Sequence, residues 1–336
     1  MRIILDAMGS DTHPGPEVRA ALEAHNRWGD RILLVGPEAE LSQAIHDAGG
    51  HATHVEIIHA PEVLEMTDKP ARAARGKAQN SMAVGMDLLK EGKADAFVTA
   101  GNTGGAMATA LFRLGRIRGV KRPAVAPTIP VQGGHALALD LGANADCRPE
   151  YLVQFALMGS VYSERIHGKH HPRVGLLSNG EEPGKGNALV KETYPLLDAT
   201  GLHFIGNVEP KEVFGGHVDV VVTDGFTGNV LLKTSEAVAR FLFDLIRTEI
   251  GASPLSTIGG LLARPAFRRV RRVLDPAEYG AAPLLGVDGL VFIGHGRSDA
   301  RALISAIRVA RQAVEMEVLP ALREAIQTLL TAEASP

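Results

Sequence analysis

Short apolar runs alternate with longer amphipathic segments through the first 250 residues of the chain. Apolar runs bounded by polar turns predict buried strands, and apolar residues repeated at three- and four-residue spacing predict helices. The predicted strands are Ile3–Ala7, Ile32–Val35, Val55–His59, Ala96–Thr99, Ala124–Ile129, Ala136–Leu141, Val174–Leu177, Phe204–Ile205 and Val218–Thr223. The predicted helices include Pro16–Arg27, Glu38–Ala48, Ser81–Glu91, Pro149–Ile166 and Gly228–Ile250. This alternation predicts an α/β fold with a mostly parallel sheet covered by helices on both faces.

Two regions depart from this alternation. The short link Val131–Gly134 joins two predicted strands directly, which favours a hairpin and therefore a mixed sheet. After Ile250 a helical pattern covers Leu255–Leu274, and a long terminal helix is predicted over Asp299–Leu330. Because no low-complexity linker separates these parts, we expect a single domain over residues 1–336 with a protruding helical insertion at residues 253–279.

The composition is that of an ordinary globular protein, with 45% hydrophobic and 22% charged residues in 336. A net charge of -3 and 4% aromatic residues give no reason to expect nucleic-acid binding. Cys147 is the only cysteine, so no intramolecular disulfide can form and a reducing compartment is indicated. Asp6 interrupts any apolar export signal, and no stretch approaches the ~20 apolar residues of a membrane span. We therefore expect a cytoplasmic protein.

Three predicted strands run into turns rich in Gly, Asn and Thr, within Ala94–Gly105, Val174–Asn187 and Val218–Val230. Glycine lets backbone N–H groups approach a ligand, and the helix that follows directs its positive dipole end to the same place. Ligands of open α/β sheets lie beyond the carboxyl ends of the strands. The three turns together predict an anion site, for which phosphate is the best candidate, although Gly and Asn are also ordinary residues of such turns.

The turn Ser178–Asn187 carries the sharpest signal. Lys185 lies between two glycines, one of them Gly184, and Asn179 and Asn187 lie close by in the sequence. A lysine there can neutralise phosphate while amides donate to it or to an oxyanion. The spacing is not that of a Walker A loop, and a solvated lysine in a long polar connection is the alternative.

The turn Thr223–Asn229 offers the carboxylate of Asp224 and the amide of Asn229. Asp224 ends a Val-rich strand, where it can orient a base, bind a cation or simply cap the next helix. In the turn after Ala96–Thr99, Asn102 or Thr103 caps the next helix, and contact with an anion is an added possibility. Further candidate contacts at these strand ends are Ser10, Asn102, Thr103 and Gly104.

His295 lies between two glycines in Gly294–Asp299, which makes it a candidate general acid or anion contact, with a surface turn as the alternative. The aspartates of Asp140–Asp146 permit a Mg²⁺ site, but nothing in their spacing demonstrates one. His167–His171 is favoured as a solvated loop over a metal site, and Cys147 is a weak candidate nucleophile. We expect no metal.

The motifs occur in an order that resembles one bacterial enzyme family over almost the whole chain. They are the turns Asp6–Asp11, Ala100–Gly104, Asp140–Asn144, Leu177–Asn187, Asp224–Asn229 and Gly294–Ser298. Together they are similar to the acyl-carrier-protein:phosphate acyltransferases of phospholipid synthesis, the PlsX family. The resemblance implies a three-layer α/β/α sandwich, similar to phosphotransacetylases and isocitrate/isopropylmalate dehydrogenases, and usually a homodimer.

The resemblance also implies a reaction without a cofactor. Inorganic phosphate attacks the thioester of a long-chain acyl-acyl-carrier protein and gives an acyl phosphate, which feeds the membrane glycerol-3-phosphate acyltransferase. Because phosphate is itself the nucleophile, the enzyme has to hold it against the carbonyl and stabilise an oxyanion. Lys185, Asn229, His295 and Asp224 are our catalytic candidates.

Two other classes of protein fit less well. A nicotinamide-dependent dehydrogenase needs a GxGxxG turn, and the first strand instead leads into Met8–Asp11. A non-catalytic scaffold does not require several Gly/Asn turns at strand ends.

The insertion carries a further signal. Leu255, Ile258, Leu261 and Leu262 recur at roughly helical spacing, and we expect Pro265 to break the run. Five arginines lie within residues 264–272, among them Arg268 and Arg269. Apolar side chains that enter a lipid interface, with arginines at anionic headgroups, predict peripheral contact with the inner face of the cell membrane. Packing against a second subunit is the alternative, and both can hold.

Overall fold

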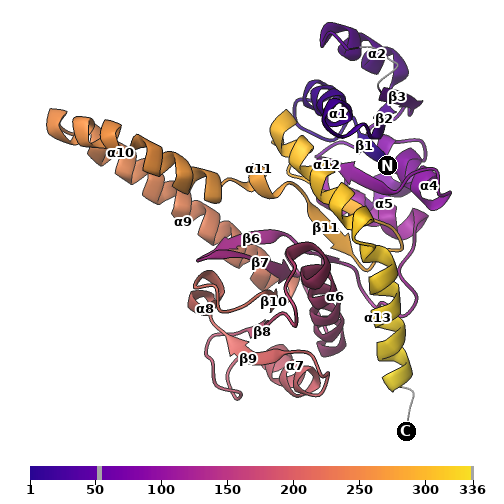
Figure 1. The fold of residues 1–336 in the computed structure, drawn as a ribbon. Helices are drawn as coiled ribbons and strands as arrows, with labels where there is room; N and C mark the ends of the chain where they lie inside the picture. The colour runs from indigo at the N-terminus through magenta and orange to yellow at the C-terminus, as the bar shows by residue number, and fades with distance from the viewer. Residues whose placement is uncertain (51–54, 334–336) are drawn as a thin grey trace.

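The computed structural model describes residues 1–50 and 55–333, and their strands form two sheets (Figure 1). The first sheet has the order β3 (Val55–His59), β2 (Arg31–Gly36), β1 (Arg2–Asp6), β4 (Ala96–Thr99), β12 (Val291–Ile293), β11 (Ala282–Leu285) and β5 (Ala124–Val125). The second has the order β6 (Thr128–Val131), β7 (Gly134–Leu139), β10 (Val220–Val222), β8 (Val174–Leu177) and β9 (Phe204–Val208). The strands pair in parallel except at β12–β11–β5 and β6–β7.

The helices cover both faces of the sheets, as the apolar alternation predicts. They are α1 (Gly15–Trp28), α2 (Glu38–Asp47), α3 (Pro70–Gly76), α4 (Ser81–Lys90), α5 (Thr103–Arg113), α6 (Pro149–His167), α7 (Ala188–Asp198), α8 (Pro210–Phe214), α9 (Gly225–Gly251), α10 (Pro254–Val273), α11 (Pro276–Tyr279), α12 (Ala300–Glu315) and α13 (Val318–Glu333). In β1, Ile3 and Leu5 belong to the core beneath α1 and α12, whereas Ile4 belongs to the core beneath α4. Successive side chains of a strand point to opposite faces, so both faces are buried.

The expected α/β/α class is confirmed, but the expectation of one sheet is wrong in detail. The predicted strand Ala124–Ile129 is divided: β5 joins the first sheet, and β6 forms the hairpin with β7 at the edge of the second. The predicted hairpin is therefore confirmed. One apolar core cluster continues from Leu5 and Leu303 to Leu139 and Phe155, so the two sheets share a core.

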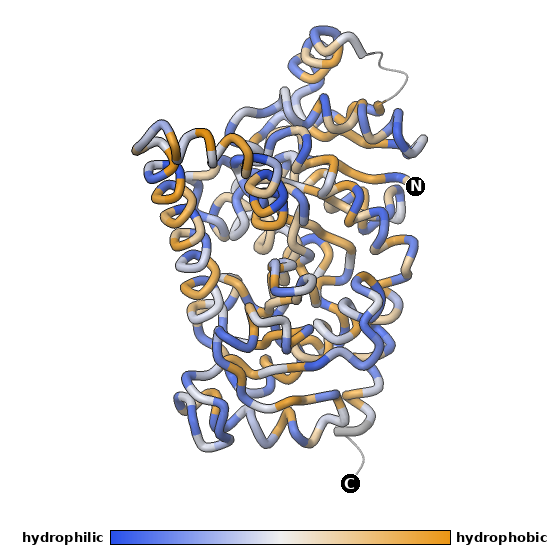
Figure 2. The backbone as a smooth tube through the Cα atoms, turned by 60° about the vertical axis from the view of Figure 1, so that its left-hand side comes forward, coloured by the Kyte–Doolittle hydropathy of each residue, from blue (hydrophilic) through white to orange (hydrophobic). Residues whose placement is uncertain are grey.

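Helices α9 and α10 lie side by side and project away from both sheets (Figure 1). None of the residues of α10 is buried, and Leu255 and Leu262 are 81% and 79% exposed. The pair of helices α9 and α10 nevertheless has hydrophobic turns along its length (Figure 2). This is the predicted helical insertion, enlarged by the preceding helix.

Two sequence expectations about helix ends are wrong. Pro265 does not break its helix, because α10 continues from Pro254 to Val273. A proline removes one backbone hydrogen bond, and on this exposed helix water can satisfy the carbonyl that loses its partner. The terminal helix is interrupted between α12 and α13, where Glu317 has a positive φ of 52°.

Candidate active site

A large cleft runs between the strand ends of the first sheet and the α9 side of the second. Its volume is about 1070 Å³, at the upper end of the range for small-molecule sites. One end is polar and is lined by Asp11, Gly101, Thr103 and His295. The remaining walls are mainly apolar, with side chains from β6, α8, α9 and the segment that follows α10.

The polar end is built by turns that follow β1, β4 and β12. The Thr99 hydroxyl donates to Asp6 Oδ2 over 2.6 Å, and Thr99 Oγ1 accepts the N–H of Gly101 over 2.9 Å. Burial raises the pKa of the Asp6 carboxyl, although its hydrogen bond with Thr99 opposes the rise. A Cβ added at Gly9 would lie 2.8 Å from the backbone nitrogen of Ala100, so only glycine allows these turns to approach so closely.

The third turn is tied to the other two by backbone hydrogen bonds. The N–H of Gly294 donates to the carbonyl of Thr99, and the N–H of Asp11 donates to the carbonyl of Gly296, each over 2.7 Å. His295 is exposed on this turn, and its Nδ1 accepts the N–H of Arg297 over 3.2 Å. A neutral imidazole in this arrangement carries its proton on Nε2, which can then donate to a ligand oxygen.

Ser10 lies in the turn after β1, beneath the polar end of the cleft. Ser10 is buried, and its N–H donates over 2.9 Å to Oε1 of Glu17, in the first turn of α1. Burial raises the pKa of the fully buried Glu17 carboxyl, while hydrogen bonds from Ser10 oppose the rise. Glu17 therefore holds the turn that presents Asp11 to the cleft.

Helix α5 directs its N-terminus to the same end of the cleft. Asn102 caps the helix by accepting the N–H of Gly105 over 2.9 Å, and its Nδ2 donates to the carbonyl of Met66 over 2.9 Å. The amides of Thr103 and Gly104 lie in the first turn, where a helix has no internal partner for them. This N-terminus can therefore receive an anion.

The turn after β8 lies on the surface of the second sheet, outside the lining of the cleft. Its polar side chains make local bonds: Asn179 Oδ1 accepts the N–H of Gly186, and Asn187 caps α7 by accepting the N–H of Val190. Lys185 and Gly184 are exposed. Among the described residues no ion pair involves Lys185, so its ammonium is open to solvent.

The start of α9 also lies outside that lining. Asp224 caps the helix, with Oδ1 accepting the N–H and Oδ2 the hydroxyl of Thr227. Asn229 lies beside Gly142, in the turn after β7. The structure thus places Thr103 and His295 in the lining of one cleft. Ser10, Asn102 and Gly104 are chain neighbours of lining residues without lining the cleft themselves, and the turns of Lys185 and Asp224 lie outside it.

The turn after β7 is a structural support. Asp140 is fully buried, its Oδ1 accepts the N–H of Val125, and its Oδ2 accepts the N–H of Asn144 over 2.6 Å. A Cβ at Gly225 would lie 2.7 Å from Asp140 Oδ2, so α9 starts in close contact with this turn. Burial raises the pKa of the nearby Cys147 thiol to about 12, which argues against a thiolate nucleophile.

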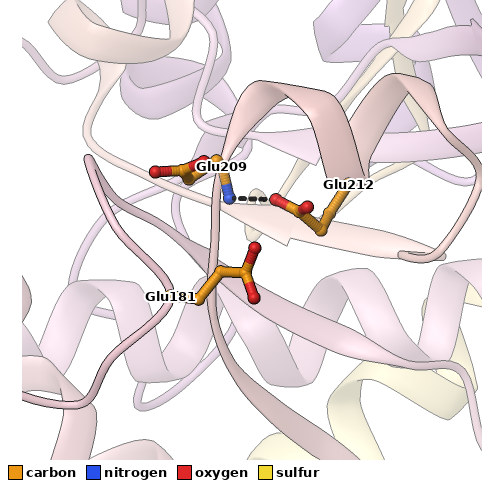
Figure 3. A group of neighbouring side chains, drawn as sticks. All are labelled: Glu181, Glu209 and Glu212. Atoms are coloured by element: carbon orange, nitrogen blue, oxygen red, sulfur yellow. Dashed lines mark hydrogen bonds between the residues drawn. The ribbon is translucent and has the colours of Figure 1, made fainter.

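Three glutamates gather beside the Lys185 turn (Figure 3). Oxygen atoms of Glu181, Glu209 and Glu212 lie within 4.8 Å of one another. Lys211 Nζ lies 2.8, 3.1 and 3.5 Å from these three carboxylates, so one lysine already pairs with all of them. The cluster is an ion-pair network at the surface.

The sequence reasoning did not find the apolar walls of the cleft. Leu231, Val238 and Leu242 of α9 line it, and their helical spacing is visible in the sequence. Other apolar lining residues, such as Ile129 and Phe214, come from distant segments that no local pattern connects to α9, although Leu231 packs against the same apolar cluster.

The chain is similar to known proteins over almost its whole length. Residues 1–320 match the family described as "Fatty acid synthesis protein". A phosphate acyltransferase of Dictyoglomus turgidum is 50% identical over 320 residues, covering 95% of both chains. Another, of Pelotomaculum thermopropionicum, is 47% identical over 331 residues, covering 98% of this chain and 96% of the relative.

The chain belongs to the phosphate acyltransferase family. Members of the phosphate acyltransferase family are transferases, and the family resemblance of the sequence motifs is therefore confirmed.

Solved structures support the fold of this phosphate acyltransferase. A phosphotransacetylase from Streptococcus pyogenes superimposes with a TM-score of 0.64 at 16% identity, covering 94% of each chain. A 4-hydroxythreonine-4-phosphate dehydrogenase from Klebsiella pneumoniae gives 0.55 at 13% identity, covering 94% of this chain and 99% of the other. At these identities the likeness concerns the fold alone. No helix in the described part of the chain is long and apolar enough to cross a membrane.

Proposed function

We propose that this phosphate acyltransferase takes a long-chain acyl group from an acyl-carrier protein and transfers it to phosphate at the polar end of the cleft. The observation that carries the proposal is the continuity between this polar end, lined by Thr103 and His295, and a large apolar cavity. A phosphate and an alkyl chain need opposite environments, and their junction is where the reacting carbonyl has to lie.

The proposed step needs no protein nucleophile. An oxygen of hydrogen phosphate forms a bond to the carbonyl carbon, the C–S bond breaks, and the proton of hydrogen phosphate passes to the sulfur of the released carrier thiol. The first-turn amides of Thr103 and Gly104 bind phosphate, and Nε2 of His295 donates to phosphate or to the oxyanion. Preorganised donors of this kind lower the barrier because they need no rearrangement as charge develops.

The turn of Lys185 and the start of α9, which lie outside the cleft lining, hold the remaining predicted site residues. Those of the Lys185 turn are proposed as further phosphate contacts. Lys185 offers a solvent-open ammonium, and Asn179, Gly184 and Asn187 belong to its turn. Asp224 and Asn229 act by fixing the start of α9, because both Asp224 oxygens already bind Thr227.

The proposed partners also include a second copy of the chain and a membrane surface. Phe226 and Phe241 of α9 are 67% and 64% exposed, which suits a homodimer contact. On α10, Leu261 and Leu262 are exposed, and Arg268 and Arg269 follow them. This arrangement suits contact with the anionic inner face of the cell membrane. Such contact would bring a poorly soluble acyl phosphate to the membrane glycerol-3-phosphate acyltransferase.

The test uses the purified full chain with hexadecanoyl-acyl-carrier protein. We expect thiol release that depends on phosphate, together with one acyl phosphate for each thiol. Chelator and added nicotinamide cofactor serve as controls, and we expect neither to change the rate. Thiol release at the same rate without phosphate would contradict the proposal.

A further inference from the structure

Helix α9 turns one apolar stripe toward the cleft. Leu231, Val238 and Leu242 line the cavity and are separated by seven and four residues, which places them on one face of the helix. Ala239 lies beside this stripe and also lines the cavity. At 1.5 Å per residue, the stripe extends for about 16 Å along the helix axis.

Further apolar residues of the lining continue this surface, and Leu231 packs against the cluster to which Ile129 belongs. These further residues include Ile129 of β6, Phe214 of α8 and Leu274, the residue after α10. Among the polar residues that α9 adds to the lining, Ser235 donates its hydroxyl to the carbonyl of Leu231 within the helix. Thr234 and Glu236 are exposed at the rim. A ligand without hydrogen-bonding groups therefore leaves few polar groups unsatisfied along this wall.

We propose that the stripe Leu231–Val238–Leu242 is the wall against which the acyl chain of the donor lies, and that Ala239 sets the chain length that the enzyme accepts. The inference rests on the proposed function. The cavity joins this wall to Thr103 and His295 without leaving the cleft, so one extended ligand can place its carbonyl at the polar end and its alkyl chain along α9.

Ala239 is the smallest side chain on this part of the wall and is half-buried, so a larger side chain here takes space from the cavity. A short chain that ends before Ala239 loses nothing from this change, whereas a long chain loses its place. The position therefore discriminates between chain lengths without touching the reacting atoms.

The experiment compares kcat/KM for hexadecanoyl- and octanoyl-acyl-carrier protein in the wild type and in Ala239→Phe. We expect the ratio of long- to short-chain kcat/KM to fall by at least about tenfold, the scale on which apolar pockets discriminate. Ala237→Phe is the matched control, because Ala237 lies on the same helix, is exposed and does not line the cavity. We expect this control to keep the wild-type ratio. Ala239→Leu provides a milder change of the same sign.

An equal loss for both donors, or an unchanged ratio in Ala239→Phe and Ala239→Leu, would overturn the assignment of the acyl wall while the enzyme remained a phosphate-dependent transferase. A wild type that makes no acyl phosphate from either donor would instead remove the proposed function on which the inference rests. The two failures are thus distinguishable by the wild-type measurement alone.

Discussion

The turns at the polar end of the cleft hold one another in place, whereas the turn of Lys185 is tied to Asn207 and Lys211, which do not line the cleft. Thr99 bonds to Asp6, and the amide of Gly294 bonds to the carbonyl of Thr99, so three strand ends form one rigid surface. In the second sheet, Asn207 donates to the carbonyl of Glu182 over 2.9 Å and Lys211 pairs with Glu181, while Lys185 itself is exposed to solvent. Two turns of similar composition thus differ in how firmly they can position a ligand.

This difference matters because catalysis of acyl transfer depends on placement. A reacting group that is misplaced by about 1 Å can cost about a hundredfold in rate. The interlocked turns can maintain such precision, since a displacement of one requires displacement of the others. We therefore expect the chemistry to depend more on the first group of turns than on the second.

The strongest test of this difference substitutes one glycine in the turns at the polar end of the cleft and one in the turn of Lys185. A Cβ at Gly9 would meet two backbone nitrogens, at 2.8 and 2.9 Å, whereas one at Gly184 would have no atom within 4 Å among the described residues other than Gly184 and its chain neighbours. We expect Gly9→Ala to lower kcat/KM at least about a hundredfold and the free energy of unfolding by about 1–3 kcal/mol, because overpacking shifts the turns. Gly184→Ala should be close to wild type in both. Steady-state kinetics and thermal unfolding provide the measurements, and equal effects would contradict the comparison.

A second test removes the side chain of His295 at the polar end of the cleft and that of Lys185 in the turn after β8. We expect His295→Ala to lower turnover about a hundredfold, the lower range for a lost proton donor. For Lys185→Ala we expect about a tenfold loss, or ~1.4 kcal/mol of barrier, because an exposed ammonium is screened by water. The measurement is acyl phosphate formation at saturating donor with the phosphate concentration varied. A larger loss for Lys185→Ala than for His295→Ala would reverse the assignment of roles.

Two histidines, His135 of β7 and His167 at the end of α6, make the stability of the protein depend on pH without involving the cleft. His167 lies edge-on to His135, with ring centroids 4.2 Å apart, and burial lowers the pKa of His167 from 6.5 to about 3. The sequence favoured a solvated loop here, which is wrong for His167. Between these two pKa values the unfolded chain binds more protons than the folded one, so stability is complete above pH 6.5 and falls as the pH drops.

We expect the free energy of unfolding to fall by about 2 kcal/mol between pH 6.5 and pH 5, at ~1.4 kcal/mol per unit. Chemical unfolding at a series of pH values measures this slope. His167→Phe should flatten it, while the same change at the exposed His170 should not. Equal slopes in the wild type and His167→Phe would show that the buried pair is not responsible.

The smallest effect on turnover is expected from substitutions in the exposed helix α10. Leu261→Glu/Leu262→Glu should leave kcat in dilute solution unchanged, because both side chains are exposed and far along α10 from the cleft lining. It should abolish sedimentation with anionic vesicles at low salt. Leu196→Glu, at an exposed leucine of α7, is the matched control and should still sediment. Retained sedimentation in the double variant, or none in a folded, active wild type, would remove the proposed membrane contact.

Much of the local structure follows from short-range chemistry and could be predicted. Glycine and asparagine after apolar runs correctly indicated that helices begin there, since Asn102, Asn187 and Asp224 all cap helices. The hairpin of β6 and β7 followed from a short Gly-containing link. Capping and turn formation depend on residues that are neighbours in the sequence, so the sequence carries the information directly.

The amino-acid sequence by itself determined the α/β alternation, the turns at the strand ends, the family and the exposed arginine-rich helix. Long-range packing places β5 and β6 in different sheets, brings Thr103 and His295 into one cleft that Lys185 does not line, and adds apolar residues of α9 to the lining beside Ile129. Only the tertiary structure decided these relations, because hydrophobic burial has no direction of its own, so an apolar face in the sequence does not reveal which other face will cover it.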